Sequence, residues 1–157
     1  KKKTITIFDV PPKRPGIYCL LNNSYNIYSY DYCQKFLIVF VNSILEKYYL
    51  QTEIILKLKK DYNNIDPNYR VLVERIVRNK KIRLITDISP ESIIEVSDAT
   101  ISIPFTSTAV TSYNKNKETI YYDPSGKLTK NNCLEKNITL ISSQKNLKFW
   151  ILNILNK

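Results

Sequence analysis

The chain has 157 residues, and its 24 Lys and Arg residues outnumber its 14 Asp and Glu residues, which gives a net charge of +10. This balance favours anionic partners such as phosphorylated ligands, anionic lipid surfaces or nucleic acid. The chain has no histidine, which excludes Ser-His-Asp catalysis, Cys-His catalysis and the common His-containing zinc sites within this segment. Its two glycines, Gly16 and Gly126, are too few for a P-loop or a dinucleotide-binding turn.

Short apolar runs alternate with segments of helical periodicity along the chain. In chain order we expect a strand at 5–10, a helix at 31–48, a strand at 53–59, a helix at 67–79, a strand at 82–86, a helix at 89–97, a strand at 99–103, a helix at 106–114, strands at 119–122 and 139–141, and a last helix from 143. This alternation predicts a parallel sheet with helices on both faces. We therefore expect an α/β fold, a single doubly wound, Rossmann-like domain over residues 1–157.

The ends of the chain and its apolar runs bear on its cellular setting. The start at Lys1-Lys2-Lys3, directly before an expected strand, is typical of a segment excised from a larger protein. No run approaches the roughly 18 apolar residues of a transmembrane helix, and the start lacks a signal-peptide pattern. We expect a cytoplasmic domain, with peripheral contact at the inner face of an anionic membrane as a further option.

Hydroxyl side chains gather where the strand at 99–103 ends. Thr106, Ser107 and Thr108 follow that strand and open a helix. Ligands of open parallel sheets bind at the carboxyl ends of the strands, and the free amide groups of a helix start suit a phosphate. The sequence therefore makes these residues candidates for phosphate binding. The alternative is that they only cap the helix.

Other candidate ligand groups fall at the same expected edge. Lys57 and Lys59 end the second strand and are suited to a phosphate or carboxylate, although they also fit a solvated charge run. Glu91, in the first turn of a helix, is placed either for a ribose diol or for the helix dipole. Asp9, after the first strand, is either a catalytic carboxylate or an ordinary turn residue.

Four blocks of sequence resemble those of a known family. They are Ile7-Phe8-Asp9-Val10-Pro11-Pro12, Leu56-Lys57-Leu58-Lys59-Lys60, Ile101-Ser102-Ile103-Pro104-Phe105-Thr106-Ser107-Thr108-Ala109 and Tyr121-Tyr122-Asp123-Pro124-Ser125-Gly126. In this order, each at an expected strand end, they resemble the bacterial polysaccharide-biosynthesis proteins named for their Pro-Phe-Thr-Ser motif. That family resembles glycosyltransferases of the two-domain GT-B architecture, and the present chain is similar to the C-terminal half, which holds the nucleotide sugar.

The order of features is also similar to that of GT-B sialyltransferases. This resemblance implies that Glu91 holds the ribose, that Thr106, Ser107 and Thr108 hold phosphate, and that Lys57 and Lys59 lie near the base or phosphate. Those enzymes have a His-Pro pair where this chain has Lys59-Lys60-Asp61. The difference argues against a CMP-sugar and leaves UDP-, GDP- and CDP-linked donors open.

The resemblance also implies a mechanism and partners. We expect a nucleotide-sugar substrate, no cofactor and no metal, with positive side chains and a helix dipole stabilising the departing nucleotide. The general base and acceptor site are expected in a missing N-terminal domain, so the chain alone would bind nucleotide without turnover. The alternatives are a non-catalytic module for a phosphorylated ligand or protein partner, and an adaptor to anionic membrane. No nucleic-acid-binding motif is present, so we do not expect nucleic acid as a partner.

Overall fold

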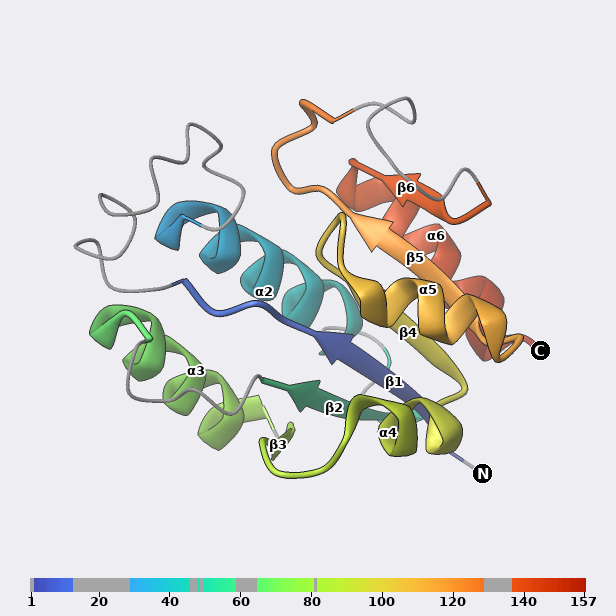
Figure 1. Cartoon of the computed structure of the whole chain (residues 1–157), viewed down its shortest axis with the longest axis horizontal. Coiled ribbons are helices and arrows are strands. Elements are labelled where there is room, and N and C mark those ends of the chain that lie inside the picture. The colour runs from blue at the N-terminus through green and yellow to red at the C-terminus, as the bar shows by residue number, and fades with distance from the viewer. Residues whose placement is uncertain are drawn as a thin grey trace.

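The computed structural model of the chain describes residues 2–12, 29–45, 48, 50–58, 65–80, 82–128 and 137–157. Within these residues, six strands form one sheet in the order β3-β2-β1-β4-β5-β6 (Figure 1). The strands are β1 (Lys3–Phe8), β2 (Thr52–Lys57), β3 (Arg83–Ile85), β4 (Ala99–Ser102), β5 (Glu118–Tyr122) and β6 (Thr139–Ile141). All neighbouring strands are parallel, which confirms the predicted Rossmann-like α/β fold.

The helices lie close to their predicted positions. They are α2 (Tyr30–Leu45), α3 (Pro67–Lys80), α4 (Pro90–Val96), α5 (Ser107–Asn114) and α6 (Gln144–Leu155). The predicted end of α2 at residue 48 was wrong, because α2 spans Tyr30–Leu45 and Tyr48 is not helical. The Tyr48 carbonyl instead accepts the backbone N–H groups of Gln51 and Thr52, at 3.0 and 3.1 Å, in the turn that leads into β2.

One face of the sheet carries the larger core. Helices α2, α3 and α6 cover this face (Figure 1). The buried side chains of β1 that face them are Ile5 and Ile7, and they pack with Phe36 and Phe40 of α2. All four side chains are fully buried, and burying each contributes about 1.5–3 kcal/mol. This cluster continues through α3 and α6 and is the main source of stability.

The other face is covered by the two short helices α4 and α5 (Figure 1). Hydroxyl side chains of the sheet lie on this face and pair with one another. Thr6 Oγ1 lies 2.7 Å from the Oγ of Ser97, which ends α4. The Thr100 hydroxyl donates to Thr119 Oγ1 at 2.9 Å. Because these buried hydroxyls are hydrogen-bonded within the fold, two small helices suffice to cover them.

Candidate functional site

The carboxyl ends of β1 and β4 lie side by side in the middle of the sheet. From β1 the chain runs outward through β2 to β3, and then returns through α4 to β4 on the other side of β1. The strand order therefore reverses between β1 and β4. In open α/β sheets, ligands bind outside the carboxyl ends of the strands at this reversal, so the segments that follow these strands form the candidate site.

The Pro-Phe-Thr-Ser segment forms the turn between β4 and α5. Phe105 has a φ of 67°, a left-handed conformation that costs a bulky residue about 1–3 kcal/mol. Proline followed by a residue of positive φ is typical of a type II turn. The Phe105 ring is partly buried against the cluster of Ala109, Tyr121 and Ile138. This packing holds the turn in its strained conformation and so fixes where α5 begins.

The hydroxyl groups of this turn form a chain of hydrogen bonds. Ser102 Oγ lies 3.1 Å from Thr108 Oγ1. The Thr108 hydroxyl donates to Thr106 Oγ1 at 3.2 Å, and the Thr106 hydroxyl donates to the Ile103 carbonyl at 2.8 Å. The Thr106 and Thr108 hydroxyls thus donate within the turn, and a contact of either with phosphate remains a prediction.

The start of α5 is not capped by a side chain. Thr106 occupies the N-cap position but makes no side-chain cap hydrogen bond, whereas Ser89 and Ser143 cap α4 and α6 in the usual way. The first amide groups of a helix have no acceptor inside the helix. Ser107 is exposed at this point. The arrangement therefore offers amide donors, one exposed hydroxyl and the positive end of the helix dipole to an anion.

Glu91 lies in the first turn of α4, which begins at the same edge of the sheet after β3. Its side chain is exposed. Helices α4 and α5 contact one another on one face of the sheet. The structure thus brings Glu91 to the edge of the sheet where the sequence placed it, and to the same face as α5; its role in ribose binding remains a prediction.

Lys57 is buried at the end of β2. Its ammonium group donates to the Leu58 carbonyl at 2.6 Å and to the Thr86 carbonyl at 2.8 Å. These bonds join the ends of β2 and β3, a structural use that the sequence did not reveal. A direct contact with phosphate remains a prediction for Lys57, and Lys59 lies outside the described residues.

Asp9 follows β1 and is 4% exposed. Its Oδ2 accepts a hydrogen bond from the Tyr69 hydroxyl of α3. Burial raises the pKa of Asp9 to about 7, because the lowering by this hydrogen bond and by the Val10 amide is smaller. The Cys33 thiol lies close by and donates to the Val10 carbonyl at 3.3 Å, and burial raises its pKa strongly. The site therefore includes a buried carboxyl that titrates near neutrality.

Two side-chain pairings at this edge were not predicted from the sequence. Tyr69 lies in the helix predicted at 67–79, and its pairing with Asp9 joins positions 60 residues apart. Asp123, after β5, is fully buried and accepts the Tyr32 hydroxyl at 3.1 Å, together with the backbone amides of Ser125 and Leu128. Burial acts to raise the pKa of Asp123, but the hydrogen bond from the Ser125 hydroxyl, at 2.6 Å, together with these three outweighs it and the pKa is lowered. No local sequence signal marks either long-range pairing.

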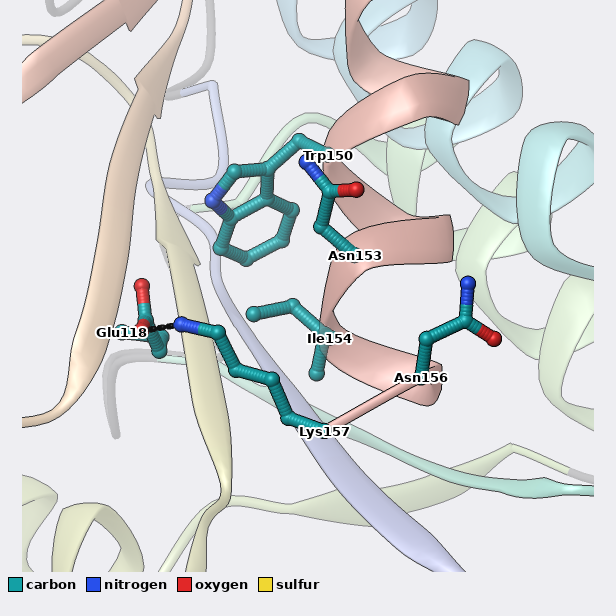
Figure 2. A pocket seen from close by; sticks show the side chains of 6 residues that line it. All are labelled: Glu118, Trp150, Asn153, Ile154, Asn156 and Lys157. Carbon is teal, nitrogen blue, oxygen red and sulfur yellow. Dashed lines mark hydrogen bonds and ion pairs between the residues drawn. The ribbon is translucent and has the colours of Figure 1, made fainter.

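A pocket of about 360 Å³ lies at the opposite edge of the sheet, near the amino end of β5. It is lined by Glu118, Trp150, Asn153, Ile154, Asn156 and Lys157. Figure 2 shows the Trp150 and Ile154 side chains extending from α6 toward the strand, beside the ion pair of Glu118 and Lys157. Because ligands of such sheets bind at the carboxyl ends of the strands, this pocket is separate from the candidate site.

Two further observations concern the described residues as a whole. No group of three or more Cys, Asp or Glu side chains among them is arranged to hold a metal ion. None of the helices in the described ranges has the length and apolar character needed to cross a membrane.

The chain is similar to known proteins in sequence and in fold. The sequence model of the family described as "polysaccharide biosynthesis PFTS motif protein" matches residues 1–151. No curated protein matches the chain significantly.

Several solved structures have a similar fold. The spinosyn rhamnosyltransferase SpnG, complexed with spinosyn aglycone, aligns with a TM-score of 0.59 and 11% identity over 99% of this chain and 38% of that one. The C-terminal domain of a group 1 glycosyl transferase, LpcC from Francisella tularensis, aligns at 0.58 and 15% over 99% of this chain and 76% of that one. The N-terminal domain of trehalose-6-phosphate phosphatase from Candida albicans aligns at 0.56 and 13% over 98% of this chain and 34% of that one. The chain thus spans well under half of the rhamnosyltransferase, and at these identities the likeness concerns the fold.

Proposed function

The chain belongs to the family of polysaccharide biosynthesis PFTS motif proteins and has the fold of glycosyltransferase domains, and we propose that it is the half of a glycosyltransferase that binds the nucleotide-sugar donor. The observation that carries this proposal is the start of α5. It lies at the reversal of strand order, within the family's own motif, and its amide groups have no side-chain cap. A donor phosphate is the natural ligand for such a helix start.

The other groups of this edge support the same ligand. The exposed carboxylate of Glu91 is suited to two hydrogen bonds from a ribose diol, and it lies on the same face of the sheet as α5. A nucleotide with its phosphate at Ser107 would then extend along this face toward α4. Lys57 and Lys59 remain candidates for the base or phosphate, and Lys57 would act through its charge because its ammonium group donates to the Leu58 and Thr86 carbonyls.

In the proposed reaction this chain stabilises the leaving group. Negative charge develops on the nucleotide phosphate as the bond to the sugar breaks, and the aligned amides of α5 are preorganised to stabilise it. The general base and the acceptor would come from a partner domain, so we propose that the 157-residue chain binds nucleotide but does not turn over. We propose that it acts at the cytoplasmic side of the membrane, without a metal or cofactor.

Titration calorimetry with UDP, GDP, CDP, UMP, CMP and inorganic pyrophosphate tests the proposal. Ser107→Asp places a carboxylate at the first residue of α5, where it favours the helix by about 0.3–1 kcal/mol but repels phosphate. Two charges about 5 Å apart interact by about 3 kcal/mol at an effective dielectric constant of about 20, so we expect affinity to fall at least tenfold. Gln144→Asp makes the same charge change at the first residue of α6 and should leave binding unchanged.

Glu91→Gln tests the proposed ribose contact separately from the phosphate contact. The substitution should lower the affinity for the nucleotides by about tenfold, since hydrogen bonds to charged groups contribute about 1.5–3 kcal/mol. It should leave the affinity for pyrophosphate unchanged. A wild-type chain that binds none of these ligands would overturn the proposal and favour a module that recognises a protein partner.

A further inference from the structure

One oxygen of the buried Asp9 carboxyl has no hydrogen-bond partner among the described residues. The carboxyl is buried and its Oδ2 accepts the Tyr69 hydroxyl, while the neighbouring Val10 amide also lowers its pKa. No hydrogen-bond donor in the described part of the chain reaches Oδ1. An unsatisfied buried acceptor costs about 1–3 kcal/mol, and more when it is charged, so such an exception calls for an explanation.

Holding α3 against β1 does not require an acid at this position. An amide oxygen would accept the Tyr69 hydroxyl equally well, without the penalty of burying a carboxyl group. Among the described residues, the side-chain groups that act on the carboxyl are the Tyr69 hydroxyl of α3 and the Cys33 thiol of α2, with Tyr30 next to Tyr69, and none of these three is a cation. The free oxygen is therefore suited to a neutral donor, an O–H or N–H group, and would repel a phosphate.

The position of Asp9 relative to α5 narrows the choice of the ligand group that could reach its free oxygen. Phe8 of β1 is in register with Ser102 of β4, so Asp9 lies beside Ile103, whose carbonyl holds the Thr106 hydroxyl. Adjacent strands are about 4.8 Å apart. Asp9 and the segment that leads to α5 therefore lie at the same edge of the sheet, on neighbouring strand ends.

At this edge, Asp9 and the start of α5 lie on opposite faces of the sheet. Asp9 bonds to α3, on the face that also carries α2, whereas α4 and α5 cover the other face. In a nucleotide sugar the phosphate links the nucleoside to the transferred sugar. If the phosphate binds at α5 and the nucleoside extends toward α4, the sugar lies on the side of Asp9.

We propose that Asp9 accepts a hydrogen bond from a hydroxyl group of the sugar that is transferred, an inference that rests on the proposed function. Asp9 then selects for a hydroxyl-bearing sugar at this position and is a binding residue for the donor. Because the carboxyl is buried, the sugar reaches it by a local opening at this edge of the sheet. Its bond to the carboxylate favours the ionised form, so donor binding near neutral pH releases a proton.

The test compares each nucleotide with its sugar conjugate, UDP with UDP-glucose and GDP with GDP-mannose, by calorimetry in buffers of different ionisation enthalpy. Asp9→Asn should lower the affinity for the nucleotide sugar at least tenfold, change the affinity for the free nucleotide by no more than about twofold, and abolish the proton release. Asp98→Asn, the same change at an exposed residue at the other end of the strands, should alter none of these.

The outcomes separate the two proposals. If the wild type binds a nucleotide sugar and Asp9→Asn binds it with the same affinity and proton release, the inference fails while the proposed function stands. If the wild type binds neither nucleotides nor nucleotide sugars, the proposed function fails and the inference with it. Tyr69→Phe removes the hydroxyl that pairs with Asp9 but keeps the Asp9 carboxyl, so proton release that is retained in Tyr69→Phe and lost in Asp9→Asn comes from Asp9 and not from Tyr69.

Discussion

Replacing Asp9 by Asn should remove a specific part of the pH dependence of folding. The folded chain holds Asp9 at a pKa of about 7, chiefly because the carboxyl is buried, whereas an Asp in an unfolded chain has a pKa of about 3.9. Between these values the folded state carries a proton that the unfolded state lacks. The neutral acid therefore stabilises the fold at low pH, and this stabilisation is lost as the pH rises through 7.

The two pKa values set the magnitude. The contribution of Asp9 to the free energy of unfolding falls by about 2.5 kcal/mol between about pH 5 and about pH 8. Asn is neutral throughout and keeps an oxygen for the Tyr69 hydroxyl, so the variant lacks this fall. At the higher pH, Asp9→Asn should therefore be more stable relative to the wild type than it is at the lower pH.

Urea unfolding at both pH values measures this difference directly. Other carboxyl groups change the stability of both proteins alike, so the quantity of interest is the variant minus the wild type. Asp98→Asn, at an exposed position, serves as the control. If the pH curves of wild type and Asp9→Asn run parallel within about 0.5 kcal/mol, the carboxyl does not titrate as argued and the reasoning is refuted.

Three further substitutions test the geometry of the site. Phe105→Gly should be more stable than Phe105→Ala in urea unfolding, because both lose the ring while Gly alone accepts the positive φ without strain; the reverse order would remove the claim of strain. Lys57→Met should lower the free energy of unfolding by about 2 kcal/mol, since one buried and one partly buried carbonyl lose their donor, and a fall in nucleotide affinity measured alongside would show that Lys57 also acts on the ligand. Tyr32→Phe should cost about 1 kcal/mol because Asp123 loses one of its hydrogen bonds, and an unchanged midpoint would indicate that this bond contributes nothing.

The sequence predicts the architecture of this chain well, because its signals are local. The helical spacing at 67–79 and the Ser89-Pro90-Glu91 helix start are visible in short windows, and both elements form where expected. Continuous apolar strands separated by helices leave few arrangements other than a parallel sheet. The strand ends, and hence the edge where ligands are expected, follow from that topology.

The site is predicted only as a set of neighbours. Sequence places Thr106 at a helix start, but it does not reveal that its hydroxyl donates backward to Ile103 instead of capping the helix. The sequence places Lys57 at a strand end, but it does not reveal that the ammonium group donates to the Leu58 and Thr86 carbonyls. These contacts, like the pairing of Asp9 with Tyr69, depend on how distant elements pack, and no local pattern encodes them.

The central claim is that α5 binds the phosphate of a nucleotide, and amide chemical shifts test it most directly. In a ¹⁵N-labelled chain titrated with the tightest-binding nucleotide of the calorimetric panel, the account predicts the largest shifts at the amides of Ser107, Thr108 and Ala109, with smaller shifts around Glu91. Shifts confined to other segments, with the start of α5 unmoved at saturation, would contradict it.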